Sequence, residues 1–494
     1  MSARESIEVE LKLDVDADQP APDLAGIAPG ATTAAPAVYE LNATYLDTPG
    51  HDLAAHRITL RRRTGGTDAG WHLKRPSHHP DARRELAIDF ADAPADGGVP
   101  QAIREAITVI VRDRPLIPVA EITTERTVTL VHAADGAVLA EFCQDRVIAH
   151  AHQSQLTQEW AEWEFELVEG DAELLTVARK RLRAAGARKA SSASKLARAI
   201  GAEPRAHKPA RLPKKPTALD LMVHSLATHR DALLTWDPLV RENAFDAVHQ
   251  MRVTARKLRS ILTSFPEILD PAAIAGLADE LRELGEVLGQ ARDREVQLEI
   301  NRGLLALEDR VPDDLRKALI DDEIARQERS LRTLRFALSS ARYLKLLDDL
   351  DDAIANPRPG PDADRGAVDV ALAGMEHAGQ RLRKAQKRLD LLDPWSDEWV
   401  EQVHRIRKRA KAVRYTADAA KPLRLKAAKK TAKRAAVIQS HLGDFQDTVV
   451  NREQIARVAA LPGLSPAAVF VLGRLDAREQ TRGRAAVQAY LDRV

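Results

Sequence analysis

Residues 1 to about 203 are patterned for β-strands that carry charge on one face. Residues 7–13 alternate apolar and polar without a break, which places Glu8, Glu10 and Lys12 on one strand face. The same alternation recurs at residues 162–167, where three glutamates share one face and large apolar groups the other. Further strands are expected at 39–45, 57–63, 71–74, 125–132 and 137–146, with a hairpin turn at Asp135-Gly136.

Helical periodicity dominates from residue 218 to the end of the chain. Helices are expected at 218–236, 243–265, 272–302, 313–337, 341–355, 365–392, 397–419, 424–442, 445–460 and 465–493. Residues 204–217 contain four prolines and five Lys or Arg, a composition typical of a semi-rigid cationic linker. The sequence therefore predicts domains at 1–203 and 218–494. A proline-rich stretch divides the second into halves at about 218–356 and 365–494.

One helical segment of this second part occurs twice. The pattern Val-His-x-x-Arg at 248–252 recurs at 403–407, about 155 positions later. Asp-Pro at 237–238 recurs at 393–394, and Leu-Gly-x-x-x-Asp at 288–293 recurs at 442–447. Three landmarks in one order at nearly one offset indicate an internal duplication.

Each copy of this segment predicts a helix with a one-sided cationic stripe. With the histidine at 0°, the basic residues three, seven and ten positions later fall at about 300°, 340° and 280°, beside an apolar stripe at about 180–260°. The ordinary alternative is a solvated helix face, but such a face usually mixes signs. Residues 248–260 hold four Lys or Arg and no acid, and 403–434 hold thirteen against one aspartate. The duplicated stripe therefore favours a polyanion ligand.

In the first part, several strands group either acids or bases on one face, more than a half-exposed sheet requires. If this sheet closes into a barrel with the polar face inward, carboxylates stand opposite Arg and Lys across the lumen. Carboxylates bind hard cations such as Mg²⁺ or Mn²⁺, and Arg and Lys bind phosphate oxygens. A metal-bridged chain of phosphates would fit such a lumen.

Over residues 5–203 the sequence resembles the CYTH domain, a family that includes class IV adenylate cyclases, thiamine triphosphatases and inorganic triphosphatases. The resemblance begins with Glu8-x-Glu10-x-Lys12. The other matching motifs are Tyr45-Leu-Asp47-Thr48, Leu60-Arg61-Arg-Arg63, His72-Leu-Lys74, Arg83-Arg-Glu85, Glu125-Arg126-Thr127, Glu141 with Asp145, Glu162/Glu164/Glu166, and Ser191-Ser-Ala-Ser194-Lys195.

The resemblance implies an α+β fold built on an eight-stranded antiparallel tunnel barrel. It implies metal-side acids at Glu8, Glu10, Asp145, Glu162 and Glu164, with Glu141 and Glu166 as supporting candidates for Mg²⁺ or Mn²⁺. It implies triphosphate-holding catalytic cations at Lys12, Arg61, Arg63, Lys74, Arg126 and Lys195. The implied reaction is attack of a metal-activated water on the terminal phosphoryl group.

Residues 218–494 resemble the CHAD domain, an all-α duplicated helical-bundle module named for its histidines. The resemblance rests on the two Val-His-x-x-Arg helices and the two Leu-Gly segments, and it implies binding of inorganic polyphosphate along a shared basic surface. The polyphosphate-binding candidates are His249, Arg252, Arg256, Arg259, His404, Arg407, Lys408, Lys411 and Arg414. The histidines could donate hydrogen bonds to phosphate or could be core residues at the edge of the stripe. Asp293 and Asp447 are expected to cap or to pair with an arginine.

Composition narrows the class of protein. Only 4% of the residues are aromatic, which leaves few base-stacking platforms and makes a nucleic-acid partner unlikely. The single cysteine, Cys143, and the lack of a long apolar run predict a cytoplasmic protein without a membrane span. Association with polyphosphate granules would follow from the expected ligand. Alternatives to a polyphosphate-binding triphosphatase are a polyphosphate receptor without catalysis, a nucleic-acid-binding helical protein and an adenylate cyclase.

Overall fold

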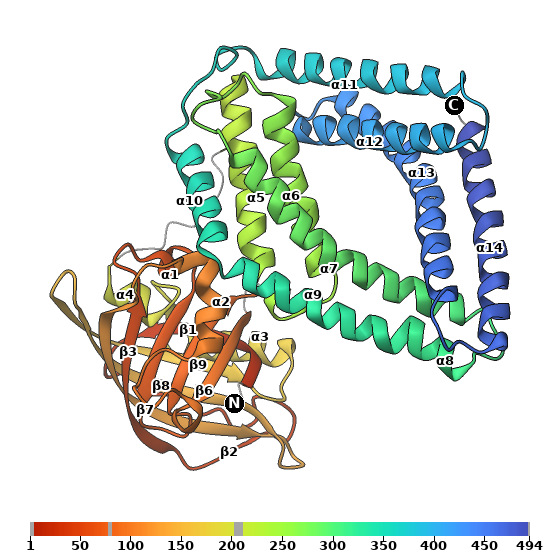
Figure 1. Ribbon diagram of the computed structural model, residues 1–494. Helices are drawn as coiled ribbons and strands as arrows, with labels where there is room; N and C mark the ends of the chain where they lie inside the picture. Colours follow the sequence, from red (N-terminus) through yellow and green to blue (C-terminus); the bar gives the residue numbers. More distant parts are fainter. Residues whose placement is uncertain (1–3, 78–81, 202–210, 493–494) are drawn as a thin grey trace. The chain divides into compact units, whose positions relative to one another are not determined.

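The computed structural model describes residues 4–77, 82–201 and 211–492, and the chain forms two compact units that divide between Lys208 and Pro209 (Figure 1). Each unit is described by itself. Residues 204–210, half of the linker predicted at 204–217, lie outside the described residues.

The first unit is a closed antiparallel barrel of eight strands. Its strands follow one another in the order β1-β6-β5-β4-β3-β7-β8-β9, and β9 pairs with β1 to close the ring. Short strands β2 and β10 pair with β7 and β1. The strands are β1 (Arg4–Val15), β2 (Thr32–Thr33), β3 (Ala37–Asp47), β4 (Thr59–Thr64), β5 (Gly70–Pro76), β6 (Ala82–Asp89), β7 (Ile117–His132), β8 (Val138–Ala151), β9 (Leu156–Leu167) and β10 (Arg188–Lys189).

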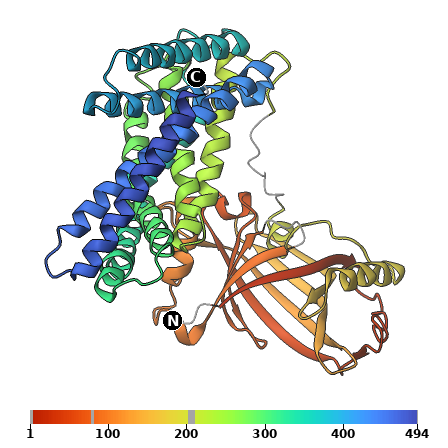
Figure 2. The same cartoon turned by 90° about the vertical axis from the view of Figure 1, so that its right-hand side faces the viewer.

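The main apolar core of this unit lies outside the barrel. Helix α3 (Ala172–Ala184) lies along the outer side of β1 (Figure 2). Leu174 and Leu182 of α3 pack against Leu13, Trp163 and other apolar residues of the strands. Because side chains alternate between the two faces of a strand, apolar packing on the outside sends the charged residues of β1 and β9 into the lumen.

Short helices complete the unit: α1 (Asp52–Ala55), η1 (Phe90–Asp92), α2 (Gln101–Val111) and α4 (Lys195–Ala199). The predicted turn at Asp135-Gly136 connects β7 to β8, with Gly136 at φ 92°. The strand expected at 57–63 begins two residues later than predicted, at Thr59. Arg57 has a left-handed backbone (φ 60°) in the turn before β4, so the alternation begins only after it.

The second unit is all-helical. Its helices are α5 (Ala218–Arg241), α6 (Ala247–Ser264), α7 (Leu277–Leu305), α8 (Asp313–Arg316), a π-helical turn (Lys317–Asp321), α9 (Asp322–Leu338), α10 (Ala341–Ala355), α11 (Ala367–Leu389), α12 (Asp397–Ala419), η3 (Lys421–Leu423), α13 (Lys426–Ala459) and α14 (Pro466–Leu491). None of the described helices is both long and apolar enough to cross a membrane.

Helix pairs α5–α6, α7–α9, α13–α14 and α11–α12 follow one another around a closed frame (Figure 1). The two sequence halves meet at two junctions. At one, Ser264 Oγ of α6 lies 3.2 Å from Thr416 Oγ1 of α12. At the other, the end of α7 and α8 share an apolar cluster with α13 and α14, and the Ser465 amide donates to Asp314 at 2.6 Å. Two separate junctions fix the halves relative to each other.

Three helical predictions need correction. Helices expected at 424–442 and 445–460 form one helix, α13, because Gly443 is accommodated within the helix and does not end it. The helix expected at 313–337 contains the π-helical turn. The two Asp-Pro landmarks are not equivalent, since Pro238 lies inside α5 whereas Pro394 lies in the connection between α11 and α12.

Candidate functional site

The strand register sorts the charges of the barrel lumen into two sectors. The neighbouring strands β8, β9 and β1 carry the predicted acids, and β5, β4 and β7 carry most of the predicted cations. Lys12 of β1 and Lys195 of α4 lie among the acids, and Glu85 lies on β6, between β1 and the cationic strands. The two walls expected from the sequence are therefore present, with two cations inside the acidic one.

Cross-strand pairing arranges the acidic sector in rows. Glu10 pairs with Glu166, which pairs with Glu141. One row further, Lys12 pairs with Glu164, and the next row joins Glu162, Asp145 and Arg126. Alternation along each strand points all of these side chains to the same side of the sheet.

Asp145, Glu162 and Glu164 form a buried carboxylate triad. One oxygen from each lies within 4.8 Å of the other two, a donor set that suits a hard divalent cation. Trp160 Nε1 donates a hydrogen bond to Glu162 at 2.7 Å and fixes that carboxylate. The triad is the metal-compatible cluster of the described residues.

Protein cations already neutralise this triad. The Lys195 ammonium lies 2.9 Å from Asp145, 2.6 Å from Glu162 and 2.7 Å from Glu164. Arg126 donates two hydrogen bonds to Asp145, at 2.8 and 2.6 Å, and a further one to Glu164. Burial alone would raise the pKa of Glu164, but Lys12, Lys195 and Arg126 hold it well below its usual value. Lys195 and Arg126 likewise lower the pKa of Asp145 against the effect of burial, so Asp145 and Glu164 remain ionised.

Lys195 owes its position to the cap of a short helix. It is the first residue of α4, where the Ser194 hydroxyl accepts a hydrogen bond from the Ala197 amide. The charges of Asp145, Glu162 and Glu164 raise its pKa well above the usual value despite burial. Its ammonium is thus a permanent charge among the triad oxygens.

A cavity of about 880 Å³ occupies the lumen. All six predicted catalytic cations line it, and so do the acids Glu8, Glu10, Glu141, Glu164 and Glu166. Asp145 and Glu162 are not among its lining residues, because Lys195 and Arg126 lie against them. Glu164 is the member of the triad that reaches the cavity.

Glu8 lies apart from the triad with which the sequence grouped it. Its carboxylate lies 2.5 Å from Lys74 Nζ, on the cationic side of the lumen. Burial raises the pKa of Glu8 to about 8, although Lys74 opposes the shift. Glu10 lies 3.6 Å from Lys12, and the charges of Lys12 and Lys74 lower its pKa against the effect of burial.

The cationic sector holds arginines whose donors are incompletely used. The Nε atoms of Arg61 and Arg63 are buried and have no hydrogen-bond partner among the described residues. Burial lowers the pKa of Arg63 to about 9, and the charges of Arg61 and Arg126 contribute. Repulsion between cations and unused donors together make this wall receptive to an anion.

Sequence reasoning did not select His72 and Glu85 as site residues, although both line the cavity. His72 Nδ1 lies 3.0 Å from Glu85 Oε1, and Lys74 lies 3.9 Å from the same atom. Burial lowers the pKa of His72 to about 4, so the imidazole is neutral. The sequence signal for Glu85 was its alternation with Arg83, which places both side chains on one strand face. An acid on a face with cations is typical of a residue that orients a neighbouring basic side chain.

In the helical unit, each stripe lies against the helix that follows it. Arg252 of α6 forms an ion pair with Asp293 of α7 at 3.1 Å, and a Cβ on Gly289 would lie 3.4 Å from its guanidinium. In the second copy, a Cβ on Gly443 would lie 3.8 Å from Arg407. The repeated Leu-Gly segments therefore provide a flat helix surface for an arginine.

The stripes of the two copies converge. Burial, together with the charges of Arg407, Arg256 and Arg252, lowers the pKa of Lys411 to about 8. Arg256 lies 5.9 Å from the ring centre of Tyr415 on the other helix, and its pKa is lowered by burial and by Arg252, Arg407 and Arg414. The Nε atoms of Arg256 and Arg407 are buried without a hydrogen-bond partner among the described residues. Cations from both halves thus share one location.

The remaining predicted residues border this cluster. His404 Nδ1 lies 2.7 Å from Gln446 Oε1, and Arg414 donates to Gln439 at 3.1 Å. Burial and nearby cations lower the pKa of both His249 and His404, so both are neutral at pH 7. Arg259 and Lys408 are exposed, and the charge of Lys408 contributes, after burial, to the lowered pKa of His404. Asp293 pairs with an arginine as predicted. Burial raises the pKa of Asp447, and the charge of Arg407 offsets part of that shift.

Known proteins match both units. The sequence matches the CYTH domain over residues 6–200 and the CHAD domain over residues 224–456. The "Uncharacterized protein Rv2226" of Mycobacterium tuberculosis is 40% identical over 492 residues, which cover 96% of this chain and 93% of that protein.

Two solved structures resemble part of the chain. PptA from Streptomyces chartreusis is 20% identical, covering 56% of this chain and 98% of its own, with a TM-score of 0.48. The CHAD domain from the plant Ricinus communis is 24% identical, covering 57% of this chain and 96% of its own, with a TM-score of 0.44.

Proposed function

Because this chain belongs to the family of proteins in which a CYTH domain precedes a CHAD domain, we propose that it is a metal-dependent phosphoanhydride hydrolase that also binds polyphosphate. Triphosphate or polyphosphate is hydrolysed in the barrel, and polyphosphate binds along the convergent stripes of α6 and α12. The observation that carries the proposal is the lumen, where an acidic sector faces arginines with unused buried donors.

The acidic sector fits Mg²⁺ or Mn²⁺ by the chemistry of its donors. Glu164, Glu10 and Glu166 line the cavity on neighbouring strands, with Glu141 and Glu8 beside them. Asp145 and Glu162, which do not line the cavity, would support this set from behind Glu164. A bound ion would supply charge stabilisation and a water of lowered pKa.

The cationic sector would bind the phosphates. Arg61 and Arg63 offer forked donors to phosphoryl oxygens, and Lys74 faces the same space. As water adds to the terminal phosphorus, the bridging P–O bond breaks and negative charge moves to the leaving phosphate. Lys12 and Lys195, which lie among the acids, would stabilise part of that negative charge.

The helical unit would bind the polyanion without a metal ion. Polyphosphate carries about one negative charge per phosphate and presents no base edge to read. Arg252, Arg256, Arg407, Lys411 and Arg414 lie within one another's electrostatic field, so a polyanion would relieve their repulsion. The neutral His249 could donate one hydrogen bond to a phosphate oxygen, whereas the single N–H of neutral His404 is already donated to Gln446 Oε1.

Phosphate release tests the hydrolytic part of the proposal. The full chain is incubated with triphosphate, ATP, thiamine triphosphate and long polyphosphate, each with Mg²⁺, Mn²⁺ or EDTA. Metal-dependent release from triphosphate supports the proposal, and cyclic AMP with pyrophosphate from ATP would indicate a cyclase instead. If none of these is formed, the barrel is a binding module and the receptor alternative stands.

Competition tests the ligand of the helical surface. Long polyphosphate should displace DNA or RNA from the protein at low concentration, whereas the reverse should need a large excess. Equal displacement in both directions would favour a nucleic-acid partner.

A further inference from the structure

A second cavity, of about 730 Å³ and here called the opening, adjoins the lumen beside β1. Its described lining residues come mainly from β1, from residues 54–59, from β6, from α3 and from residues 189–197.

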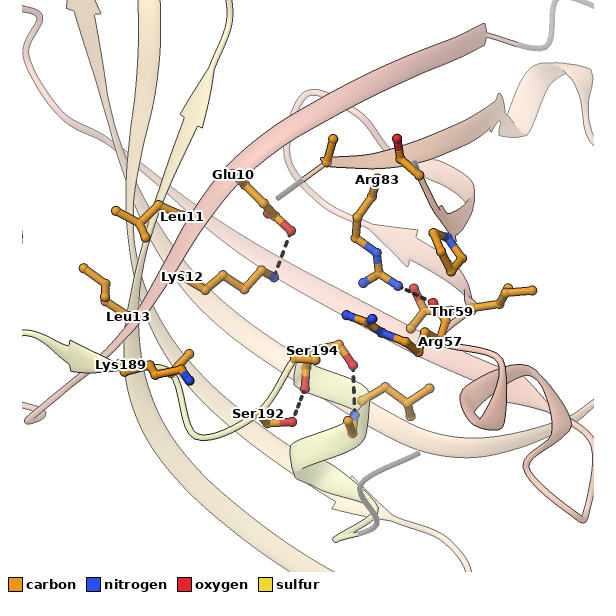
Figure 3. A pocket seen from close by; sticks show the side chains of 18 of the residues that line it. Glu10, Leu11, Lys12, Leu13, Arg57, Thr59, Arg83, Lys189, Ser192 and Ser194 are labelled. Atoms are coloured by element: carbon orange, nitrogen blue, oxygen red, sulfur yellow. Dashed lines mark hydrogen bonds and ion pairs between the residues drawn. The ribbon is translucent and has the colours of Figure 1, made fainter. Parts of the chain in front are cut away.

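The second cavity continues from the lumen. Five residues line both cavities: Glu10, Lys12, Thr59, Arg83 and Ser194. In Figure 3 the side chains of Lys12, Arg57 and Arg83 extend toward one another from β1, from the turn before β4 and from β6. A ligand in the lumen could therefore extend into this opening past Lys12.

The opening is strongly cationic. Six Lys or Arg residues line it, and Glu10 is the one carboxylate among its described lining residues. Four of these six cations do not line the lumen: Arg57, Arg179, Arg183 and Lys189. Arg83 donates a hydrogen bond to the Arg57 carbonyl oxygen at 2.5 Å, which holds the two guanidinium groups in the same region. Their mutual repulsion contributes to a lowered pKa of Arg83, after burial.

The chemistry of the opening suits phosphate better than a nucleoside. Its described lining contains no Phe, Tyr, Trp or His on which a base could stack. Arginine side chains recognise phosphate oxygens through forked donors and need no planar partner. The cationic lining continues from the lumen into the opening, as a linear polyanion would require.

We propose that this opening is a phosphate subsite that receives the continuation of linear polyphosphates longer than triphosphate. Arg57, Arg83 and Arg183 would contact phosphates beyond the three held in the lumen. The inference rests on the proposed hydrolysis in the lumen and names its preferred substrate class as chains rather than triphosphate or nucleoside triphosphates.

The test compares substrates of different length on full-chain variants. Arg57→Ser and Arg183→Ser are made singly and together, and Lys180→Ser is the matched control, since Lys180 is exposed on the same helix and does not line the opening. For each protein, kcat/KM is measured on triphosphate, ATP and linear chains of about eight phosphates. Because the helical unit is intact in every variant, its contribution cancels in the comparison.

In the double variant, the ratio of kcat/KM on the longer chains to that on triphosphate should fall about tenfold. This corresponds to about 1.4 kcal/mol of transition-state stabilisation, as expected for one to two lost charge contacts. Lys180→Ser should keep the wild-type ratio. A double-variant ratio within twofold of wild type overturns the subsite. A parallel fall on ATP also overturns it, because the opening would then hold a nucleoside.

Failure of the proposed hydrolysis is distinguishable from failure of the subsite. If the wild type releases phosphate from no substrate, the hydrolase proposal fails. Calorimetry with triphosphate and with the chain of about eight phosphates then tests the subsite by measuring the affinity for each. The double variant should then lose about tenfold in affinity for the longer chain relative to triphosphate. An equal loss for both, or no loss, overturns the subsite.

Discussion

The barrel lumen and the helical surface both gather cations, but they balance those charges differently. In the lumen, Lys12, Lys195 and Arg126 each contact a carboxylate at 2.6 Å. On the helical surface, Arg256 and Lys411 face other cations, and their pKa values fall below the usual range. An anion that binds in the lumen must therefore replace a carboxylate as the partner of a cation. An anion that binds on the helices instead reduces the repulsion between cations.

This difference has a functional consequence. A phosphate that draws Lys12 or Lys195 away from Glu164 leaves a buried carboxylate without its partners, which is unfavourable unless another cation replaces them. The lumen should therefore bind phosphate and metal together. The helical surface has no such requirement and should bind a polyanion by charge density alone.

The largest expected effect comes from Glu164→Gln. Glu164 pairs with Lys12, Lys195 and Arg126, so the neutral amide leaves three buried cations partly uncompensated. Hydrolysis should fall at least about 100-fold, and the free energy of unfolding should fall by about 3–5 kcal/mol. Phosphate release and urea denaturation measure the two effects.

Glu121→Gln is the control for that substitution, because Glu121 lies on β7 with a side chain 64% exposed. It should change neither quantity appreciably. Wild-type hydrolysis by Glu164→Gln would remove this carboxylate from the mechanism.

Reversing charge in both stripes should produce the next largest effect. Arg256→Glu with Lys411→Glu should weaken binding of long polyphosphate at least about 100-fold, whereas either change alone should cost about tenfold, since the other helix still holds part of the ligand. Calorimetry with chains of about one hundred phosphates measures this. Arg329→Glu, on the exposed side of α9, is the control. A double variant that binds like wild type would show that the stripes are solvated faces.

Coupling between metal and triphosphate should be smaller but specific to the lumen. A non-hydrolysable triphosphate analogue should raise the affinity for Mn²⁺ at least about tenfold, and Mn²⁺ should raise the affinity for the analogue by the same factor. Calorimetric titrations in both orders measure the two factors. Polyphosphate binding to the helical surface should change little when EDTA is added. Independent binding of metal and analogue would contradict the expectation that phosphate takes Lys12 or Lys195 from Glu164 and that the metal ion replaces them.

The smallest effect concerns pH. The pKa of Lys411 is about 8, so it loses its charge as pH rises from 7 to 9, while the neighbouring arginines stay charged and the neutral histidines do not titrate. Affinity for polyphosphate should fall over this range by about fivefold or less. Lys411→Arg should flatten the profile. An unchanged slope in that variant would place the titration elsewhere.

The sequence by itself determined the strands, the repeated helices and the chemical type of both sites. Alternation at Glu8, Glu10 and Lys12 and at Glu162, Glu164 and Glu166 sends those side chains to one face whatever the rest of the sheet does. Helical spacing likewise fixes which cations share a face of α6 or α12. These are local consequences of backbone geometry, so a single sequence contains them.

Only the tertiary structure decided which charges become partners. Closure of the barrel sets the register that places Lys195 among Asp145, Glu162 and Glu164 and moves Glu8 to Lys74, and no local pattern encodes that register. The frame of helices brings Arg256 and Lys411 into one another's field from opposite halves. Folding of β1 against β6 likewise brings Lys12 and Arg83 to the lining that the two cavities share. Contacts between distant segments depend on packing of the whole domain, which is why spacing along the chain predicted the residues but not their pairs.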